Sequence, residues 1–156
     1  MPLTRRAPVR AATVTVSALL LGACWAGVPD TIGARTDGLA PCPSTPNCVH
    51  TGMRHPRGTK GLFARGDIGR RYLMPRIREV VESMPRSTVV TVTDQYLHAE
   101  FRSRIFRFVD DLEILIAPNR ELLVRSASRV GSGDMGVNAA RVEELRRLLA
   151  EAEILR

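Results

Sequence analysis

The chain has 156 residues, of which 44% are hydrophobic and 25% are charged, and its formal net charge is +7. These values are typical of one globular domain with an N-terminal extension. Three arginines and no acidic residue lie in residues 1–23, so the remaining chain has a net charge of +4. This mild excess is compatible with an anionic membrane surface, whereas scattered arginines and few aromatic residues argue against nucleic acid as a partner.

Residues 1–23 have the pattern of a secretory leader. A basic segment, Met1–Arg10, precedes the uncharged run Ala11–Leu21. That run is too short to cross a bilayer, which requires about 20 apolar residues. It ends in Leu21-Gly-Ala-Cys24, which resembles the lipobox of bacterial lipoproteins. The resemblance implies that residues 1–23 are a signal peptide and that Cys24 carries a diacylglycerol. We therefore expect an exported lipoprotein, anchored to the membrane and facing the periplasm or the outer surface.

Two other leaders stay open. An ordinary signal peptide, cut near Ala23 or Ala26, would leave Cys24 incidental. The triplet Thr4-Arg5-Arg6 resembles part of a twin-arginine leader, but the residues after it lack the usual aromatic residue and leucine.

Residues 24–38 are expected to form a flexible tether, because they contain glycine and proline and show no apolar period. Cys42 and Cys48 follow in a proline-rich stretch. If Cys24 carries lipid, two cysteines remain in an exported protein, and this even number predicts a disulfide. A metal site that adds His50 and His55 and a redox dithiol are alternatives, although the cysteine spacing is wider than in the usual zinc and redox motifs.

Residues 39–156 predict a single α+β domain, an antiparallel β-meander of about four strands with flanking N- and C-terminal helices. Apolar residues recur at i, i+3, i+4 and i+7 in the first helix, and Pro85 ends it. Apolar and polar residues alternate in the second strand, as in an antiparallel sheet with one covered face. We expect residues 53–71 to form a loop. Asn138 is placed to cap the last helix. The expected elements are helix Met74–Met84, strands Ser87–Thr93, Tyr96–Ser103, Phe106–Ala117 and Glu121–Ala127, and a helix from Asn138 to about Leu155.

Four motifs stand out in this domain. They are Pro41–Cys48, Tyr96–Glu100, Phe108–Glu113, and Arg125–Gly131 with Asp134–Asn138 and Arg141. Over about residues 39–150 they resemble the motifs of the family catalogued as domain of unknown function 1499. The family has no established activity, so the resemblance implies exported or membrane-associated members and a polar signature, but no substrate and no catalytic residue.

The polar signature suggests a site for a small anion near the glycine-rich segment after Arg125. Arg125 and Arg129 could hold a carboxylate or phosphate with their planar guanidinium groups. The alternative is a structural network in which both arginines pair with Asp110, Asp111 or Glu113. The residues expected to bind the ligand are Arg125, Ser126, Ser128, Arg129, Asp134, Asn138 and Arg104.

A hydrolase is the alternative function. His98, with Asp110 or Glu100, could act as a base for Ser126 or Ser128, but these serines lie within a strand instead of on a strained strand-to-helix turn. No cofactor is predicted. A metal site built from Asp110, Asp111, Glu113 and Asp134 is disfavoured, because the adjacent Asp110 and Asp111 would point to opposite faces of a strand. The sequence thus favours a lipid-anchored, non-enzymatic binding module for a small anionic or amphipathic ligand or an envelope protein. A purely structural lipoprotein is the third hypothesis.

Overall fold

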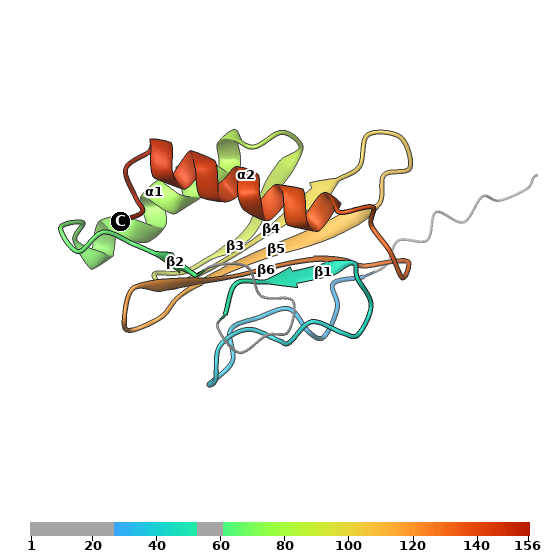
Figure 1. Cartoon of the computed structure of the whole chain (residues 1–156), viewed down its shortest axis with the longest axis horizontal. Coiled ribbons are helices and arrows are strands. Elements are labelled where there is room, and N and C mark those ends of the chain that lie inside the picture. The colour runs from blue at the N-terminus through green and yellow to red at the C-terminus, as the bar shows by residue number, and fades with distance from the viewer. Residues whose placement is uncertain (1–26, 53–60) are drawn as a thin grey trace, which may run out of the picture.

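The computed structural model describes residues 27–52 and 61–156. The expected signal peptide and the lipidation site Cys24 lie outside the described residues, as does His55. The described chain contains two helices and six strands in an α+β arrangement, and all strand pairs are antiparallel (Figure 1). In chain order the elements are β1 (Cys48–His50), β2 (Leu62–Phe63), α1 (Arg70–Ser83), β3 (Ser87–Val92), β4 (Tyr96–Arg102), β5 (Val109–Ile116), β6 (Glu121–Ser128) and α2 (Val137–Glu151).

The sheet has more strands than the four expected. The meander β3–β4–β5–β6 is present, but β1 and β2 both pair with the free edge of β6, giving the order β1-β6-β5-β4-β3 with β2 beside β1 on β6. These two strands contain three and two residues. Such short segments show no alternation, so only their backbone pairing with β6 identifies them as strands.

Both helices cover one face of the sheet, and residues 27–47 lie across the other (Figure 1). Leu73, Ile77 and Val81 of α1 and Leu145 and Leu149 of α2 are fully buried against the strands. On the strands, alternate residues such as Leu97, Leu112, Ile114, Leu122 and Val124 face the helices, as the period of two requires. We call the side covered by the helices the helix face and the opposite side the outer face.

The predicted helix boundaries are corrected at three of the four ends. Helix α1 begins one turn before Met74, so Pro75 lies beyond its first turn. It ends as expected, because Met84 precedes Pro85 and takes an extended conformation. Helix α2 starts after Gly136, whose φ of 82° is in the left-handed region that glycine adopts without strain. It ends at Glu151, four residues before the predicted end at Leu155.

Part of the expected tether contacts the sheet. The Gly33 amide donates a hydrogen bond of 2.8 Å to Glu113 Oε1 on the outer face. Leu39 and Ala40, which follow, are buried. The domain therefore begins its contacts within a few residues of the first described residue, Gly27.

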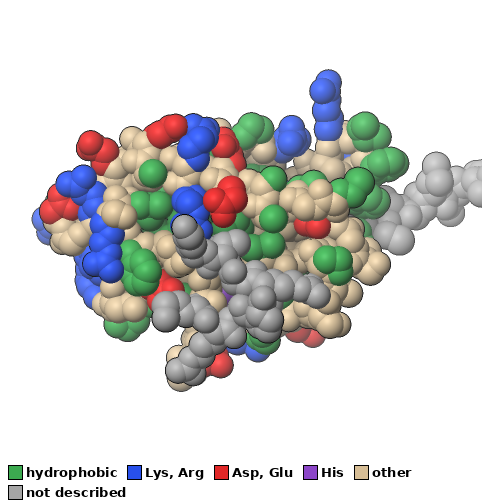
Figure 2. Space-filling model, in the orientation of Figure 1, with side chains coloured by type: hydrophobic (Ala, Val, Ile, Leu, Met, Phe, Trp, Pro, Cys, Tyr) green, Lys and Arg blue, Asp and Glu red, His purple; other side chains and the backbone are tan. Residues whose placement is uncertain are grey.

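One end of the sheet carries several loops. Residues 103–108 join β4 to β5 there, and residues 129–136 join β6 to α2. We call this the loop end. Ile105, Phe106 and Phe108 are 80%, 72% and 52% exposed, and Figure 2 shows hydrophobic side chains gathered at this end, on the right of the view. No helix among residues 27–52 and 61–156 is long and apolar enough to cross a membrane.

Candidate functional site

Strand alternation in β6 separates the residues that the sequence grouped into one site. Ser126 and Ser128 point to the helix face, while Arg125 and Arg129 point to the outer face. The structure therefore forms two polar clusters, one on each side of the sheet, and does not bring the two arginines and the two serines around one ligand.

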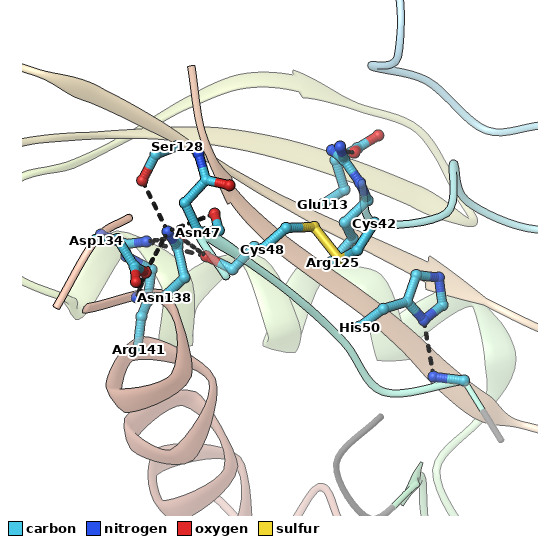
Figure 3. The surroundings of a disulfide bond; sticks show 12 residues. Cys42, Asn47, Cys48, His50, Glu113, Arg125, Ser128, Asp134, Asn138 and Arg141 are labelled. Atoms are coloured by element: carbon cyan, nitrogen blue, oxygen red, sulfur yellow. Dashed lines mark hydrogen bonds and ion pairs between the residues drawn. A yellow bond between two sulfur atoms is a disulfide. The ribbon is translucent and has the colours of Figure 1, made fainter. Parts of the chain in front are cut away.

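The cluster on the helix face is built around Asn138, which is fully buried in the first turn of α2 (Figure 3). Its Oδ1 accepts a hydrogen bond of 2.6 Å from Ser126 Oγ. Its Nδ2 lies within 2.9 Å of Ser128 Oγ and 3.2 Å of the Asn47 carbonyl oxygen. One side chain thus joins β6, α2 and the segment before β1, and we call this group the Asn138 cluster.

The side chain of Asp134, and not that of Asn138, accepts hydrogen bonds from backbone N–H groups at the start of α2. Its Oδ2 accepts a hydrogen bond of 2.8 Å from the Asn138 amide and its Oδ1 one of 3.0 Å from the Gly136 amide. Burial would raise the pKa of the Asp134 carboxyl, but these backbone N–H groups outweigh burial and lower the pKa. The prediction that Asn138 caps α2 is wrong, because its side chain is engaged with the strands.

Arg141 completes the helix-face cluster. Its Nη2 lies 2.6 Å from Asp110 Oδ2, and its Nη1 donates a hydrogen bond of 2.9 Å to Ser126 Oγ. The guanidinium also lies over the Phe101 ring, 4.6 Å from its centroid. Asp110 is therefore paired with a helix residue and not with Arg125 or Arg129.

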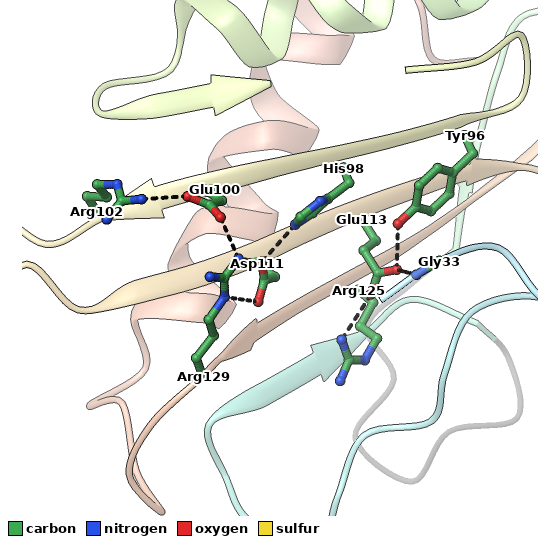
Figure 4. Close-up of polar contacts among 9 residues, drawn as sticks. All are labelled: Gly33, Tyr96, His98, Glu100, Arg102, Asp111, Glu113, Arg125 and Arg129. Carbon is green, nitrogen blue, oxygen red and sulfur yellow. Dashed lines mark hydrogen bonds and ion pairs between the residues drawn. The ribbon is translucent and has the colours of Figure 1, made fainter. Parts of the chain in front are cut away.

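The outer face carries a second cluster around Arg129 (Figure 4). Arg129 Nε lies 2.8 Å from Asp111 Oδ2, and its Nη2 lies 2.7 Å from Asp111 Oδ1 and 2.6 Å from Glu100 Oε1. His98 Nε2 lies 2.7 Å from the same Asp111 Oδ1. The side chains of Arg129 and Asp111 are 3% and 2% exposed, so the pair is sealed from water.

The charges of this cluster stabilise each other. Burial would raise the pKa of Asp111, but hydrogen bonds from Arg129 and His98 outweigh it and hold the pKa below its usual value. Hydrogen bonds to Asp111 raise the pKa of the Arg129 guanidinium, against the opposing effect of burial. Arg129 is therefore a permanent cation whose charge is compensated by two carboxylates.

The positive charge of Arg125 is also balanced by a carboxylate of the domain. Its Nη1 lies 3.0 Å from Glu113 Oε2, and the two side chains are 5% and 0% exposed. The other oxygen of Glu113 accepts hydrogen bonds from Tyr96 Oη at 2.9 Å and from the Gly33 amide. Burial, followed by the negative charge of Glu113, raises the pKa of Tyr96. Arg125 Nε has no hydrogen-bond partner among the described residues.

The structure does not assemble the residues of the hydrolase alternative. The expected partner of His98 was Asp110 or Glu100, but its ring contacts Asp111. Its ring lies on the outer face, whereas Ser126 and Ser128 lie on the helix face and bond to Asn138. The last predicted ligand residue, Arg104, is exposed in the connection between β4 and β5, apart from both clusters.

The disulfide between Cys42 and Cys48 is confirmed, with an S–S distance of 2.03 Å and Cα atoms 5.5 Å apart. In the disulfide neither sulfur is available as a thiolate ligand, which removes both cysteines from the alternative metal site. Within residues 27–52 and 61–156, no group of three or more His, Cys, Asp or Glu side chains is arranged to hold a metal ion.

A surface cavity of about 260 Å³ lies at the start of α1, away from both clusters. It is lined by Arg70, Arg71, Leu73, Asp94, Gln95, Ile116 and Arg120. The cations are partly engaged, since Arg70 Nη2 donates to the Pro118 carbonyl oxygen and Arg120 Nη2 to those of Arg65 and Ile68. None of the predicted site residues contributes to this cavity.

Sequence reasoning missed Tyr96 and Asn47 as members of the two clusters. Alternation could have found Tyr96, because it lies two residues before His98 and therefore on the same face. Asn47 carries no such signal, since it reaches Asn138 from a loop 91 residues away in sequence.

The fold defines a class of protein: an antiparallel sheet with two helices on one face and buried ion pairs on the other. A comparison with protein families matches residues 38–149 to the family described as protein of unknown function (DUF1499), and the chain belongs to that family. A comparison with curated proteins gives no match.

Proposed function

We propose that this protein is an exported, lipid-anchored binding module without enzymatic activity. The observation that carries the proposal is the disulfide between Cys42 and Cys48, because disulfides persist in oxidising compartments and are rare in the cytosol. The leader that ends in Leu21-Gly-Ala-Cys24 supplies both an export signal and an attachment site for lipid.

The geometry of the polar residues supports binding more than catalysis. A nucleophile and its base must lie within hydrogen-bonding reach, and the sheet separates His98 from Ser126 and Ser128. The buried ion pairs of Arg125 and Arg129 act as architecture, because both guanidinium groups lie inside the domain and each already pairs with a buried carboxylate.

The ligand is therefore assigned to the surface and not to the buried clusters. Among the seven predicted ligand residues, Arg104 alone forms no side-chain hydrogen bond or ion pair with a residue that the structure describes. It belongs to an exposed loop that also carries Ile105 and Phe106. Charge beside exposed apolar side chains suits an amphipathic ligand or partner.

Lipidation is tested by expressing the full chain in a bacterium that has a lipoprotein pathway and measuring the intact mass of the purified product. We expect a chain that starts at Cys24 and carries acyl groups, and that sediments with membranes. The Cys24→Ser variant is the matched control and should lose both the added mass and the membrane sedimentation. An unmodified Cys24 in the native chain, or a cleavage site elsewhere, would overturn the lipid anchor.

Binding without catalysis is tested with His98→Ala and Arg104→Glu. If the proposal holds, molecules that copurify with the mature domain, detected by mass spectrometry, depend on Arg104 and are returned chemically unchanged. Arg71→Glu, at an exposed position on α1, is the control for an equal change of charge. A turnover product that disappears in His98→Ala would contradict the proposal and restore the hydrolase hypothesis.

A further inference from the structure

The loop end exposes an unusual amount of apolar surface. Besides Ile105, Phe106 and Phe108, Met135 is fully exposed and Val137 is 47% exposed. The topology places these side chains at one end of the sheet, because β4 ends, β5 begins, β6 ends and α2 begins there. The Phe106 and Phe108 rings stack on each other, with centroids 5.5 Å apart. Contiguous apolar patches on a soluble surface mark contacts with membranes or partners.

The same end carries uncompensated positive charge. Arg104 and Arg107 are exposed and form no ion pair with any other residue that the structure describes. The acidic groups on the neighbouring strands are already used, since Glu100 pairs with Arg102 and Arg129 and Asp110 pairs with Arg141. Apolar side chains interleaved with arginines are the pattern of a surface that enters the headgroup region of an anionic bilayer.

The position of the chain start directs this end toward a membrane. The described chain begins at Gly27, three residues after Cys24 in the sequence. It begins toward the loop end of the molecule, on the right of Figure 1. Three residues span at most about 10 Å. A lipid on Cys24 would therefore hold the loop end close to the bilayer from which the lipid extends.

We propose that the loop end inserts into the interface of a bilayer containing anionic phospholipids. Ile105, Phe106 and Phe108 lie at the boundary of the acyl chains, and Arg104 and Arg107 contact lipid phosphates. The proposal rests on the proposed anchor for its orientation, but the contact itself is a property of the described domain. It gives the anchored protein a second attachment, which fixes how the domain is presented to the envelope.

A bilayer fits this surface better than a protein. Ile105, Phe106 and Phe108 lie in the loop of the protruding hairpin formed by β4 and β5. A stable protein interface, by contrast, buries about 1,600 Å² of well-packed surface. Protruding aromatic and aliphatic side chains enter a fluid interface without a matching pocket. A second copy of the chain or an envelope protein on this surface is an outcome that the experiments below detect.

Vesicle binding tests the contact without the lipid. Residues 24–156 with Cys24→Ser contain every buried core residue that the structure describes, from Leu39 to Ile154. We expect this chain to sediment with vesicles of phosphatidylcholine mixed with phosphatidylglycerol, and much less with phosphatidylcholine alone, because anionic headgroups give the negative surface potential that attracts arginine. Phe106→Ser should weaken the binding about tenfold. Arg104→Glu with Arg107→Glu should weaken it by at least a similar factor and remove its salt dependence.

Matched variants at the opposite end control for general effects of these changes. Tyr72 is 54% exposed on α1, so Tyr72→Ser removes an exposed aromatic side chain, and Arg71→Glu reverses an exposed charge. Both should bind vesicles like the parent chain. Equal loss in the control and test variants, or no binding by the parent chain, overturns the proposal. So does a dimer in sedimentation velocity that Phe106→Ser abolishes.

Fluorescence locates the inserted residue directly. Trp25 is the single tryptophan, so Trp25→Phe gives a background in which Phe106→Trp is the reporter. We expect vesicles with brominated acyl chains to quench the emission of this reporter and to leave a Tyr72→Trp reporter unchanged. Equal quenching at both positions would contradict insertion at the loop end. Because Cys24→Ser is present throughout, a negative result here leaves the anchor standing, and an unmodified Cys24 in the native chain leaves the insertion standing.

Discussion

Arg129 and Asp111 face each other across β6 and β5 in a two-bond ion pair, with both side chains almost completely buried. The Nε–Oδ2 and Nη2–Oδ1 distances are 2.8 Å and 2.7 Å. Glu100 and His98 complete the contacts of the two partners. A buried pair of this kind adds little to stability in comparison with an apolar pair, but removing one partner leaves an uncompensated charge in the interior.

Arg129→Ala is therefore expected to destabilise the domain by about 3 kcal/mol, because Asp111 would remain buried without its cation. The free energy of unfolding, measured with urea at neutral pH, checks this. The control is Arg147→Ala, which breaks exposed, solvent-screened pairs with Glu144 and Glu151 and should change the free energy of unfolding far less. A stable Arg129→Ala domain that had lost a bound anion would show that Arg129 serves a ligand and not the fold.

Acid should weaken the fold through Asp111 and Asp134. The pKa of each carboxyl is held below its ordinary value in the folded chain. A group with a depressed folded pKa contributes stability above its unfolded pKa, about 3.9 for aspartate, and that stability is lost as the pH falls through the folded pKa. We expect the urea midpoint to be level near neutrality and to fall progressively below about pH 4.

Asp134→Asn isolates one part of this acid response. The amide keeps an oxygen that can accept from the Gly136 or Asn138 amide, but it does not titrate. The variant should be less stable at neutral pH and should lose less stability between neutral and acidic pH than the parent chain. Curves of unfolding free energy against pH that run parallel would show that Asp134 does not contribute to the acid response.

Alternation of apolar and polar residues in β4 predicted an antiparallel sheet with one covered face, and with it the meander and the class of fold. The same alternation could have divided the site, since Arg125 and Ser126 are adjacent in β6 and must point to opposite faces. Grouping residues by sequence motif ignored that constraint. The ion-pair alternative stated at the sequence level named Glu113 and Asp111, and both form the pairs described.

Other features left no pattern that the sequence could show. Strand β1 forms because the backbone of Cys48, Val49 and His50 pairs with the edge of β6, more than seventy residues away in the sequence. Gly33 reaches Glu113 from a segment with no apolar period, so a tether was expected where the chain covers the outer face. The exposed Phe106 and Phe108 were assigned to the strand that begins at Val109, since exposure cannot be read from apolar character alone.

Asn138→Asp should be damaging although it is isosteric. A carboxylate cannot donate to the Asn47 carbonyl oxygen or to Ser128 Oγ, and it would face the carboxylate of Asp134. The nearby Arg141 offsets only part of this repulsion. We expect a loss of about 2 kcal/mol or more in the free energy of unfolding, from buried groups left unpaired.

Ala139→Asp is the matched control for that substitution. It adds the same charge one residue later, at an exposed position in the first turn of α2, where an acidic side chain is neutral or slightly favourable. Urea unfolding of both variants separates the two effects. Similar losses in both would mean that negative charge near the helix start, and not the hydrogen bonds of Asn138, sets the outcome.

Reduction of the Cys42–Cys48 disulfide should lower the free energy of unfolding by about 2 kcal/mol, the value that the chain-entropy model gives for so short a loop. The loop that the bond closes contains Asn47, whose carbonyl oxygen accepts from Asn138 Nδ2, so reduction also loosens the Asn138 cluster. A reductant should therefore lower the urea midpoint of the parent chain. It should not change the urea midpoint of the double variant Cys42→Ala and Cys48→Ala, which should lie at about the midpoint of the reduced parent.

Alanine is preferred to serine in this variant because Cys48 is 1% exposed, and a hydroxyl there would be buried. A parent chain equally stable with and without reductant would mean that the packing of residues 39–50 on β6 holds the loop without the bond.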